Sequence, residues 1–205
     1  MTKEQTQDPI LMDIPMPIDT ERLLLRVPQA GDGQILFEAI EETFDQVNQW
    51  MPWAKELGDV DEKEAICRRA QAKFLLREDM MLLAFDQKGK LLGATGLHRF
   101  DWALRRFEIG YWVRTSEQNK GYATEIANAL TRYAFGVLDA RAVMIGHADG
   151  NERSKNVIQK LGFTLEGRAK FDITLPNGDV VDSLTYSRTD TKNLPELQIK
   201  YGGGT

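Results

Sequence analysis

Residues 108–125 have the residue types and spacing of an anion-binding turn. The aromatic and β-branched residues up to Val113 predict a strand, and helical spacing of apolar residues begins after Gly121. A strand that turns into a helix N-terminus directs several unpaired N–H groups and the positive end of the helix dipole at one point. Gly121 would let a phosphate approach the backbone closely, Asn119 tolerates a left-handed turn, and Lys120 adds a positive charge. The segment matches neither GxGxxG nor GxxxxGK[ST], so dinucleotide and nucleoside-triphosphate loops fit poorly.

A second group of polar residues lies at the head of a helix predicted from Glu152 to Leu161. Asn151 stands at the N-cap position, and Gly162 ends the helix. A capped amphipathic helix accounts for nearly every residue of this stretch. It does not account for Ser154, a hydroxyl at the head of an apolar stripe.

These two segments resemble motifs of the GNAT superfamily of N-acetyltransferases. The pyrophosphate loop of that family has the pattern Gln/Arg-x-x-Gly-x-Gly/Ala, which Gln118, Gly121 and Ala123 match. The EIGYWV and GYATE context and the N-x-x-S-x-x-V-x-x-K-L-G-F helix are most similar to the branch that acetylates the N-termini of ribosomal proteins. For the loop alone, an ordinary strand–loop–helix with a glycine for close packing is the alternative interpretation.

The resemblance implies acetyl-CoA as cosubstrate, with no metal. Ser154 would protonate or stabilise the departing thiolate, and Asn151 would hydrogen-bond the pantetheine arm or the acceptor. The oxyanion would be stabilised by backbone N–H groups between Tyr111 and Val113, and the absence of an evident Ser/His/Asp or Cys/His set favours direct transfer. The residues expected to bind the cosubstrate are Tyr111, Trp112, Val113, Gln118, Asn119, Lys120, Gly121, Tyr122, Ala123, Thr124, Asn151 and Ser154.

The general base has several candidates. Glu108 opens the motif strand, where many family members carry a glutamate that acts through water, although a solvent-facing charge is an equal interpretation. Glu78 and Asp79 are alternatives, and His98 or His147 could also face the site. An α-amino group has a pKa of about 7.7–8.0 and needs only a weak base, whereas a lysine amine near 10.4 needs a stronger one.

The tryptophans could border the acceptor or simply pack in the core. Trp53, next to Pro52, resembles the aromatic turn beside the acceptor cleft of this family. Packing is the more usual role for Trp50, Trp53 and Trp102 alike.

The order of predicted elements is strand, two helices, three strands, helix, strand, helix and two strands. It predicts an α+β (mixed α/β) fold with a central mixed sheet of about seven strands and helices on both faces. By the resemblance, the fourth and fifth strands, Glu108–Val113 and Ala142–His147, splay apart around the pantetheine arm. We expect an N-terminal arm at 1–19, one acetyltransferase domain at 20–188 and a mobile tail at 189–205.

The composition excludes several classes of protein. The 205 residues suffice for one domain, and the single cysteine, Cys67, cannot form an internal disulfide. A net charge of −5 argues against a nucleic-acid partner and suits a cationic acceptor. The sequence shows neither a secretory signal nor a membrane-spanning run, so we expect a cytoplasmic monomer or homodimer.

The sequence leaves three functions open. The chain could acetylate the N-terminus of a ribosomal or other protein, or it could acetylate a polyamine, an aminoglycoside or another small amine. It could also be a module that binds acyl-CoA without catalysis. The presence of Asn151 and Ser154 beside the loop favours an enzyme.

Overall fold

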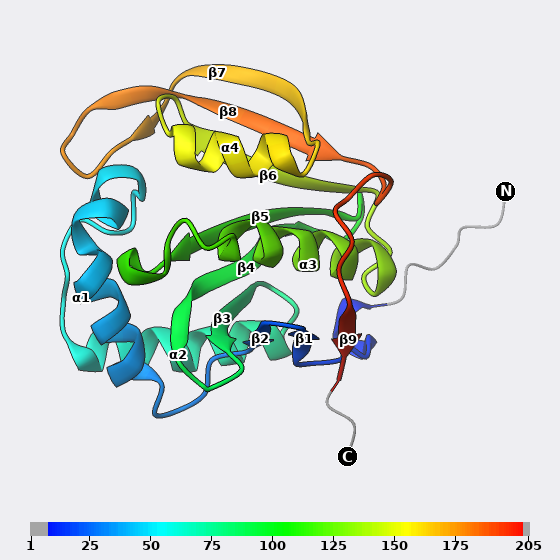
Figure 1. Ribbon diagram of the computed structural model, residues 1–205, viewed down its shortest axis with the longest axis horizontal. Coiled ribbons are helices and arrows are strands. Elements are labelled where there is room, and N and C mark those ends of the chain that lie inside the picture. Colours follow the sequence, from blue (N-terminus) through cyan, green and yellow to red (C-terminus); the bar gives the residue numbers. More distant parts are fainter. Residues whose placement is uncertain (1–7, 203–205) are drawn as a thin grey trace, which may run out of the picture.

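The computed structural model describes residues 8–202, which form one nine-stranded mixed sheet with helices on both faces (Figure 1). The strand order across the sheet is β7-β8-β6-β5-β4-β3-β2-β1-β9. The strands are β1 (Ile18–Thr20), β2 (Leu23–Arg26), β3 (Met80–Asp86), β4 (Leu91–Asp101), β5 (Arg106–Val113), β6 (Ala142–Ala148), β7 (Thr164–Thr174), β8 (Val180–Arg188) and β9 (Ile199–Tyr201). The helices are α1 (Gly33–Trp50), α2 (Val60–Leu75), α3 (Tyr122–Gly136) and α4 (Glu152–Lys160), with short 3₁₀ turns η1 (Pro9–Leu11) and η2 (Thr115–Glu117).

Local sequence signals set the ends of the helices, and the predicted Asn151 cap and Gly162 stop of α4 are both present. Asp59 caps α2 by accepting a hydrogen bond from the Glu62 N–H group at 2.8 Å. Asn151 caps α4, and Gly162 follows that helix with φ +65°, a left-handed conformation that favours glycine.

Each face of the sheet has its own hydrophobic core. On one face, Phe107 and Ile109 of β5 pack with Ile126 and Leu130 of α3. On the other face, Trp112 of β5 packs against a cluster that includes Leu36 and other residues of α1 and α2. Figure 1 shows α3 in front of the middle of the sheet. Because side chains alternate along a strand, neighbouring residues of β5 reach opposite sides of the molecule.

The parallel strands β5 and β6 separate after a short stretch of pairing. Their paired residues are Arg106 with Ala142, Phe107 with Val143, and Glu108 with Met144, and the pairing ends there. On its other side, β5 stays paired with β4 up to Val113. The predicted divergence of these two strands is therefore confirmed, and a gap opens between them beyond Glu108.

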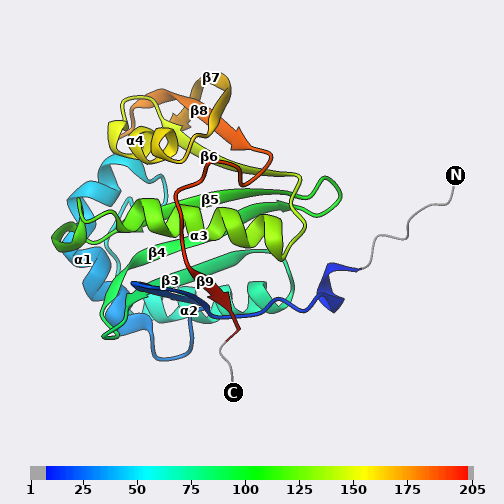
Figure 2. The same cartoon turned by 45° about the vertical axis from the view of Figure 1, so that its right-hand side comes forward.

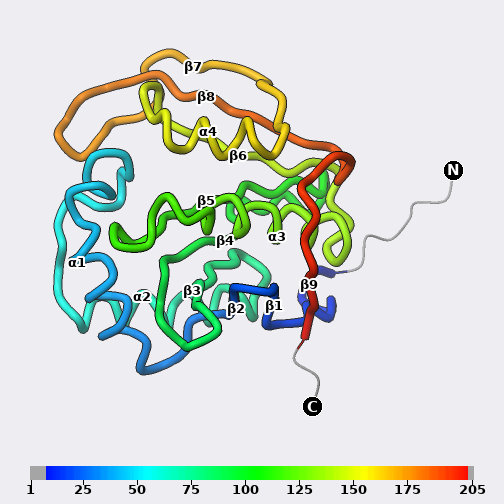
Figure 3. The backbone as a smooth tube through the Cα atoms, in the orientation of Figure 1, coloured from blue at the N-terminus to red at the C-terminus, as the bar shows by residue number. Residues whose placement is uncertain are grey.

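The sheet has two short strands more than the expected seven. The prediction of a mobile tail is wrong for Ile199–Tyr201, which forms β9 and pairs antiparallel with β1. Figures 2 and 3 show the chain after β8 passing α3 to reach β9. Leu194 is buried in the core there, and the Asn128 side chain of α3 donates a hydrogen bond to the Pro195 carbonyl at 2.9 Å. Apolar burial and this hydrogen bond hold a segment whose run of terminal glycines suggested a mobile end.

At the other terminus, the expected arm also enters the sheet. The last two residues of the 1–19 segment, Ile18 and Asp19, belong to β1. Residues 1–7 and 203–205 lie outside the described part of the chain.

Candidate active site

The loop between β5 and α3 ends in an uncapped helix N-terminus. Gly121 occupies the N-cap position with φ +84°, and Asn119 has φ +61°, so the left-handed turn expected of this loop is present. The first hydrogen bond of α3 runs from the Glu125 N–H group to the Gly121 carbonyl, and no side chain caps the helix. The N–H groups of Tyr122, Ala123 and Thr124 therefore have no acceptor within the helix.

The space above Gly121 is open. Among the atoms of residues 8–202, a Cβ atom at this position would have only Nη2 of Arg22 within 4 Å, at 3.6 Å. Arg22, from the turn between β1 and β2, donates to the Lys120 carbonyl at 3.1 Å and to the Glu125 carboxylate. A glycine backbone that is open above and carries free N–H groups suits a close phosphate contact.

The positive charge of Lys120 is largely committed to a local ion pair. Its Nζ lies 2.9 Å from the Glu117 carboxylate, which also binds Lys90 at 2.5 Å. Hydrogen bonds from these two lysines lower the pKa of Glu117, and the bond to Glu117 raises the pKa of Lys120. The two cations and one anion leave a net charge of about +1 beside the loop.

Hydrogen bonds of the Gln118 side chain connect the loop to β5, α1 and α4. Its Nε2 donates to the Val113 carbonyl at 3.0 Å and to Oε1 of Gln46 on α1. Nη1 of Arg153 on α4 donates to both Gln46, at 2.8 Å, and Gln118. The side chain expected to bind the cosubstrate is thus engaged in positioning the loop relative to α1 and α4.

A carboxylate of α1 holds the beginning of the same loop. Glu42 accepts a hydrogen bond from the Ser116 N–H group at 2.9 Å and binds Nε of Arg114 at 2.8 Å. Desolvation raises the pKa of Glu42, but the hydrogen bonds from Ser116 and Arg114 outweigh it, and the net pKa is lowered to about 2.

Backbone groups of β5 open into the gap beside β6. The Arg114 N–H group donates to the carbonyl of Leu92 on β4, so by alternation Tyr111 and Val113 direct their N–H groups away from β4. The pairing with β6 has ended at Glu108, so these N–H groups face the gap. Their role as oxyanion donors stays a prediction.

On the α4 side of the gap, a tyrosine and a serine form a hydrogen-bonded pair. The Tyr111 hydroxyl lies 3.1 Å from Oγ of Ser154, and either oxygen could donate. Burial raises the pKa of Tyr111 to about 12, despite an opposing effect of the bond to Ser154. The tyrosine therefore keeps its proton at neutral pH. The sequence predicts cosubstrate binding and oxyanion stabilisation by the backbone at Tyr111, and it does not indicate a role for the Tyr111 hydroxyl.

Asn151 is used mainly as a helix cap. Its Oδ1 accepts a hydrogen bond from the Ser154 N–H group at 3.1 Å. This bond fixes the first turn of α4 and so the position of the Ser154 side chain. Within residues 8–202, Nδ2 of Asn151 makes no hydrogen bond and is available to another molecule.

On the opposite face of β5, Glu108 lies where the two strands part. Its Oε2 accepts a hydrogen bond from Nη1 of Arg99 at 2.7 Å. A Cβ atom on Gly146 of β6 would lie 3.5 Å from Oε1 of Glu108, so the carboxylate reaches across toward β6. The absence of a side chain at Gly146 leaves room beside it.

The other base candidates separate into two groups. Glu78 is exposed, and His147 is buried with its ring stacked on Tyr186 at 5.5 Å. Asp79 and His98 instead contact one another, with Oδ1 and Nδ1 separated by 2.8 Å. The structure therefore brings His98 to the same face as Glu108 and leaves Glu78 and His147 away from it.

The tryptophans have different surroundings. Trp102 packs edge-on against Phe100 and Phe107 and donates a hydrogen bond to the Arg77 carbonyl at 2.8 Å, which confirms the packing interpretation for this residue. Trp50 lies against Gly150, where a Cβ atom would be 3.5 Å from its ring. Trp53 is half exposed, and its predicted place beside an acceptor stays a prediction.

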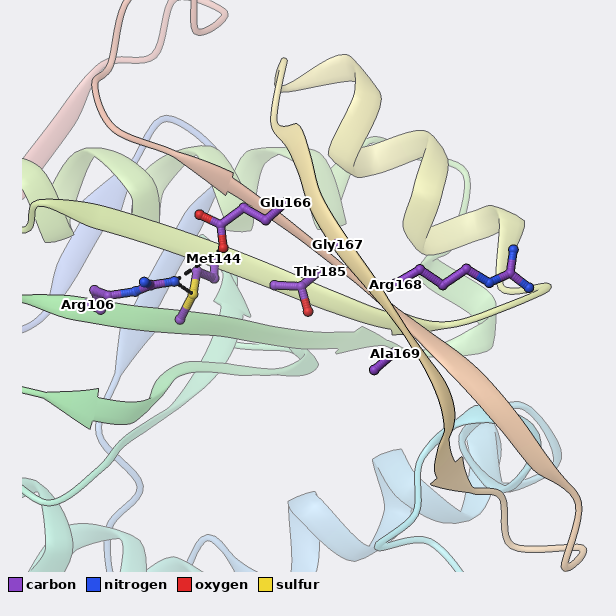
Figure 4. Close-up of a pocket in the computed structure, with 7 residues that line it drawn as sticks. All are labelled: Arg106, Met144, Glu166, Gly167, Arg168, Ala169 and Thr185. Atoms are coloured by element: carbon purple, nitrogen blue, oxygen red, sulfur yellow. Dashed lines mark hydrogen bonds and ion pairs between the residues drawn. The ribbon is translucent and has the colours of Figure 1, made fainter.

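A cavity of about 380 Å³ continues the Glu108 face toward β7 (Figure 4). Strand register places Arg106, Met144 and Thr185 on this face, and Nη2 of Arg106 lies 3.2 Å from the Glu166 carboxylate. The cavity is lined by Arg106, Met144, Glu166, Gly167, Arg168, Ala169 and Thr185.

Residues 8–202 contain neither a metal-binding cluster nor a membrane-spanning helix. No group of three or more His, Cys, Asp or Glu side chains could hold a metal ion. None of the described helices is both long and apolar enough to cross a membrane.

Comparison with known proteins identifies the family. The sequence profile described as "Acetyltransferase (GNAT) domain" matches residues 22–164. The chain is 33% identical over 171 residues to "Putative ribosomal N-acetyltransferase YdaF" of Bacillus subtilis (strain 168), covering 82% of this chain and 91% of that protein. The chain therefore belongs to the GNAT acetyltransferases.

Solved structures share the fold at lower identity. The ribosomal L7/L12 alpha-N-protein acetyltransferase RimL, in complex with coenzyme A, superposes with a TM-score of 0.79 at 23% identity, covering 88% of this chain and 99% of RimL. The microcin C7 self immunity acetyltransferase MccE, in complex with acetyl-CoA and AMP, gives a TM-score of 0.76 at 23% identity. The match covers 83% of this chain and 93% of MccE.

The Glu42 contacts predict an acid-sensitive loop. Because the pKa of Glu42 falls from 4.5 to about 2 on folding, its contribution to stability is complete above pH 4.5 and is lost as the pH falls toward 2. Glu42→Gln should lower the melting temperature at pH 6 and flatten its decline between pH 4.5 and 2, in calorimetric scans. Glu41→Gln, at an exposed neighbouring position, is the control. Identical acid profiles for Glu42→Gln and the wild type would contradict the assignment.

Proposed function

We propose that this GNAT acetyltransferase transfers acetyl from acetyl-CoA to the N-terminal α-amine of a protein, with ribosomal proteins as the first candidates. One observation carries the proposal: the gap between β5 and β6 has hydroxyl groups on one face and a carboxylate on the other. Tyr111 and Ser154 lie on the α4 side, and Glu108 lies on the opposite side. A thioester and an amine could approach from the two sides and meet in the gap.

The loop fits the pyrophosphate of acetyl-CoA. In this proposal the free N–H groups at the start of α3 bind the phosphates, because Gly121 leaves the backbone open and no side chain caps the helix. Lys120 and Arg22 lie alongside with positive charge. Acetyl-CoA supplies the activated acetyl group, and its pantetheine arm would run along the unpaired edge of β5 beside Asn151.

The transfer itself requires charge stabilisation on both sides of the gap. The N–H groups of Tyr111 and Val113 would stabilise negative charge that develops on the carbonyl oxygen. Ser154 would give a proton to the departing thiolate and regain one from the nitrogen as the amide forms, and the Tyr111 hydroxyl would hold the serine in position. The carboxylate of Glu108 would attract the positively charged amine, and a base on the same face of the sheet would take its proton.

Three observations support a protein terminus as acceptor. The relatives YdaF and RimL are named as ribosomal acetyltransferases. The cavity beside Glu108 could receive residues that follow the reacting amine. An α-amine, with a pKa of about 7.7–8.0, is partly neutral near pH 7 and needs little basic assistance. MccE has the same fold and a different named role, so a small amine is the alternative to test.

Ser154 and Tyr111 should act as one unit. Ser154→Ala should lower kcat about 10²-fold with little change in the KM for acetyl-CoA, because the hydrogen bond matters mainly in the transition state. Tyr111→Phe should have a similar effect, and the double variant should be little worse than either single variant. Steady-state kinetics of the three variants check this. Fully multiplicative losses, or turnover of Ser154→Ala within about threefold of wild type (~0.7 kcal/mol), would contradict it.

The identity of the acceptor can be tested by mass spectrometry of the acetylated products. We expect higher kcat/KM for Ser- and Ala-starting peptides than for spermidine or an aminoglycoside.

The part of the cavity in acceptor binding can be tested by filling it. Gly167 has an ordinary φ, and within residues 8–202 a Cβ atom there would contact nothing within 4 Å, so Gly167→Leu should fill the cavity without distorting β7. This variant should raise the KM for the peptide severalfold and leave acetyl-CoA affinity unchanged.

Gly136→Leu is the matched control, since Gly136 is equally open at the end of α3. A preference for either small amine would exclude the peptide acceptor. An unchanged peptide KM in Gly167→Leu would remove the cavity from the acceptor site.

A further inference from the structure

Asp79 and His98 form a pair beside the gap that the functions considered above do not use. Asp79 directly precedes β3, and its Oδ1 lies 2.8 Å from Nδ1 of His98 on β4. An ionised carboxylate in this position accepts a hydrogen bond from Nδ1–H. The neutral imidazole is then held in the tautomer whose Nε2 is bare and can accept a proton.

The imidazole ring lies over two glycines of the sheet. A Cβ atom on Gly96 would be 2.8 Å from Nε2 of His98, and one on Gly110 would be 3.3 Å from the same atom. The absence of side chains at these two positions therefore makes the space that the ring occupies. Nε2 has no hydrogen-bond partner among residues 8–202, and about a third of the side chain is exposed.

His98 is also the direct neighbour of Glu108. The two residues are partners across β4 and β5, so their side chains leave the same face of the sheet. Glu108 is the last residue of β5 that pairs with β6. Nε2 thus lies on the side of the sheet opposite Ser154, next to the point where the gap opens.

We propose that His98 is the base that removes a proton from the acceptor amine, and that Asp79 is a positioning residue that fixes its tautomer. The proposal rests on the acetyl transfer proposed above and names its proton acceptor. Glu108, bound to Arg99, then holds the ammonium group electrostatically before the proton leaves.

The protons balance as follows. The acceptor R–NH₃⁺ gives one proton to Nε2 of His98, which passes it to solvent at its exposed edge. The neutral nitrogen then attacks the thioester carbon, the C–N bond forms and the C–S bond breaks. The thiolate takes a proton from Ser154, and the second proton lost by the nitrogen restores that hydroxyl. The sum is one amide, one thiol and one proton released.

The charged groups around His98 come from three segments. Asp79 lies ahead of β3, Glu108 lies on β5, and Arg99 follows His98 on β4. Glu78, the neighbour of Asp79, is exposed, and among the described residues the carboxylate bonded to the ring is that of Asp79. It therefore provides a matched control for the removal of a nearby carboxylate.

The tautomer can be read without any substrate. The chain has only two histidines, so nitrogen-15 NMR of the full-length protein resolves both imidazoles. Neutral His98 should carry its proton on Nδ1, and Asp79→Ala should shift it to the usual Nε2–H form, whereas Glu78→Gln should not. An Nε2–H tautomer in the wild type would overturn the proposal, because that nitrogen could not accept a proton.

Kinetics test the role itself, with acetyl-CoA and a Ser-starting peptide as substrates. His98→Gln should lower kcat/KM about 10²-fold and leave a pH–rate profile that follows the neutral fraction of the acceptor amine, because no imidazole is left to take the amine's proton. Asp79→Ala should lower kcat/KM about tenfold, and Glu78→Gln should leave it unchanged. The KM for acetyl-CoA should change little in any of them.

A milder variant guards against simple loss of folding. In Gly110→Ala the only atoms of the described chain within 4 Å of the new methyl group belong to His98, so the methyl group should displace the ring and reduce kcat/KM severalfold. It should have no further effect in a His98→Gln background. If the wild type is active and the kcat/KM of His98→Gln lies within threefold of the wild-type value, the role of His98 as the base is wrong, while the proposed acetyl transfer stands. A wild type that acetylates no peptide or amine would overturn the proposed function as well.

Discussion

The separation of β5 from β6 after Glu108 is the constraint on which the candidate site depends. A parallel sheet normally pairs each strand on both sides, and unpaired backbone groups inside a protein cost free energy. This cost falls on one edge of β5, where pairing with β6 has ended and the N–H groups of Tyr111 and Val113 point away from β4. In the proposed mechanism, Ser154 on one face of the sheet and Glu108 on the other act at this edge.

The loop at the end of β5 is held by residues distant in sequence. Gln46 and Glu42 of α1, Arg153 of α4 and Arg22 beside β2 all contact it. These contacts connect the loop to both cores, although α1 covers one face of the sheet and α4 the other. The helix N-terminus of α3 is thereby fixed in place before any substrate arrives, and preorganised N–H groups need not be rearranged during binding.

Much of this could be predicted from the sequence, because the signals are local. Apolar periodicity predicted the four helices, and the order of elements predicted the fold. Gly121 and Ser154 stood out because a glycine before a helix allows a close phosphate contact and a hydroxyl at the head of an apolar stripe needs a reason. The role of the Tyr111 hydroxyl could not be predicted, since nothing local indicates that it meets Ser154 of α4. The same holds for Asp79 and His98, which meet only because β3 and β4 pair. Strand β9 was missed because its three residues gain stability only from β1 and the core.

Amide hydrogen exchange at individual residues of β5, with and without acetyl-CoA, tests the central claim most directly. If the gap receives the pantetheine arm, exchange at Tyr111 and Val113 should slow on addition of acetyl-CoA. Exchange at Gly110, which faces β4, should change little. The account would be contradicted if saturating acetyl-CoA left the exchange rates of Tyr111 and Val113 unchanged while slowing exchange elsewhere on the sheet.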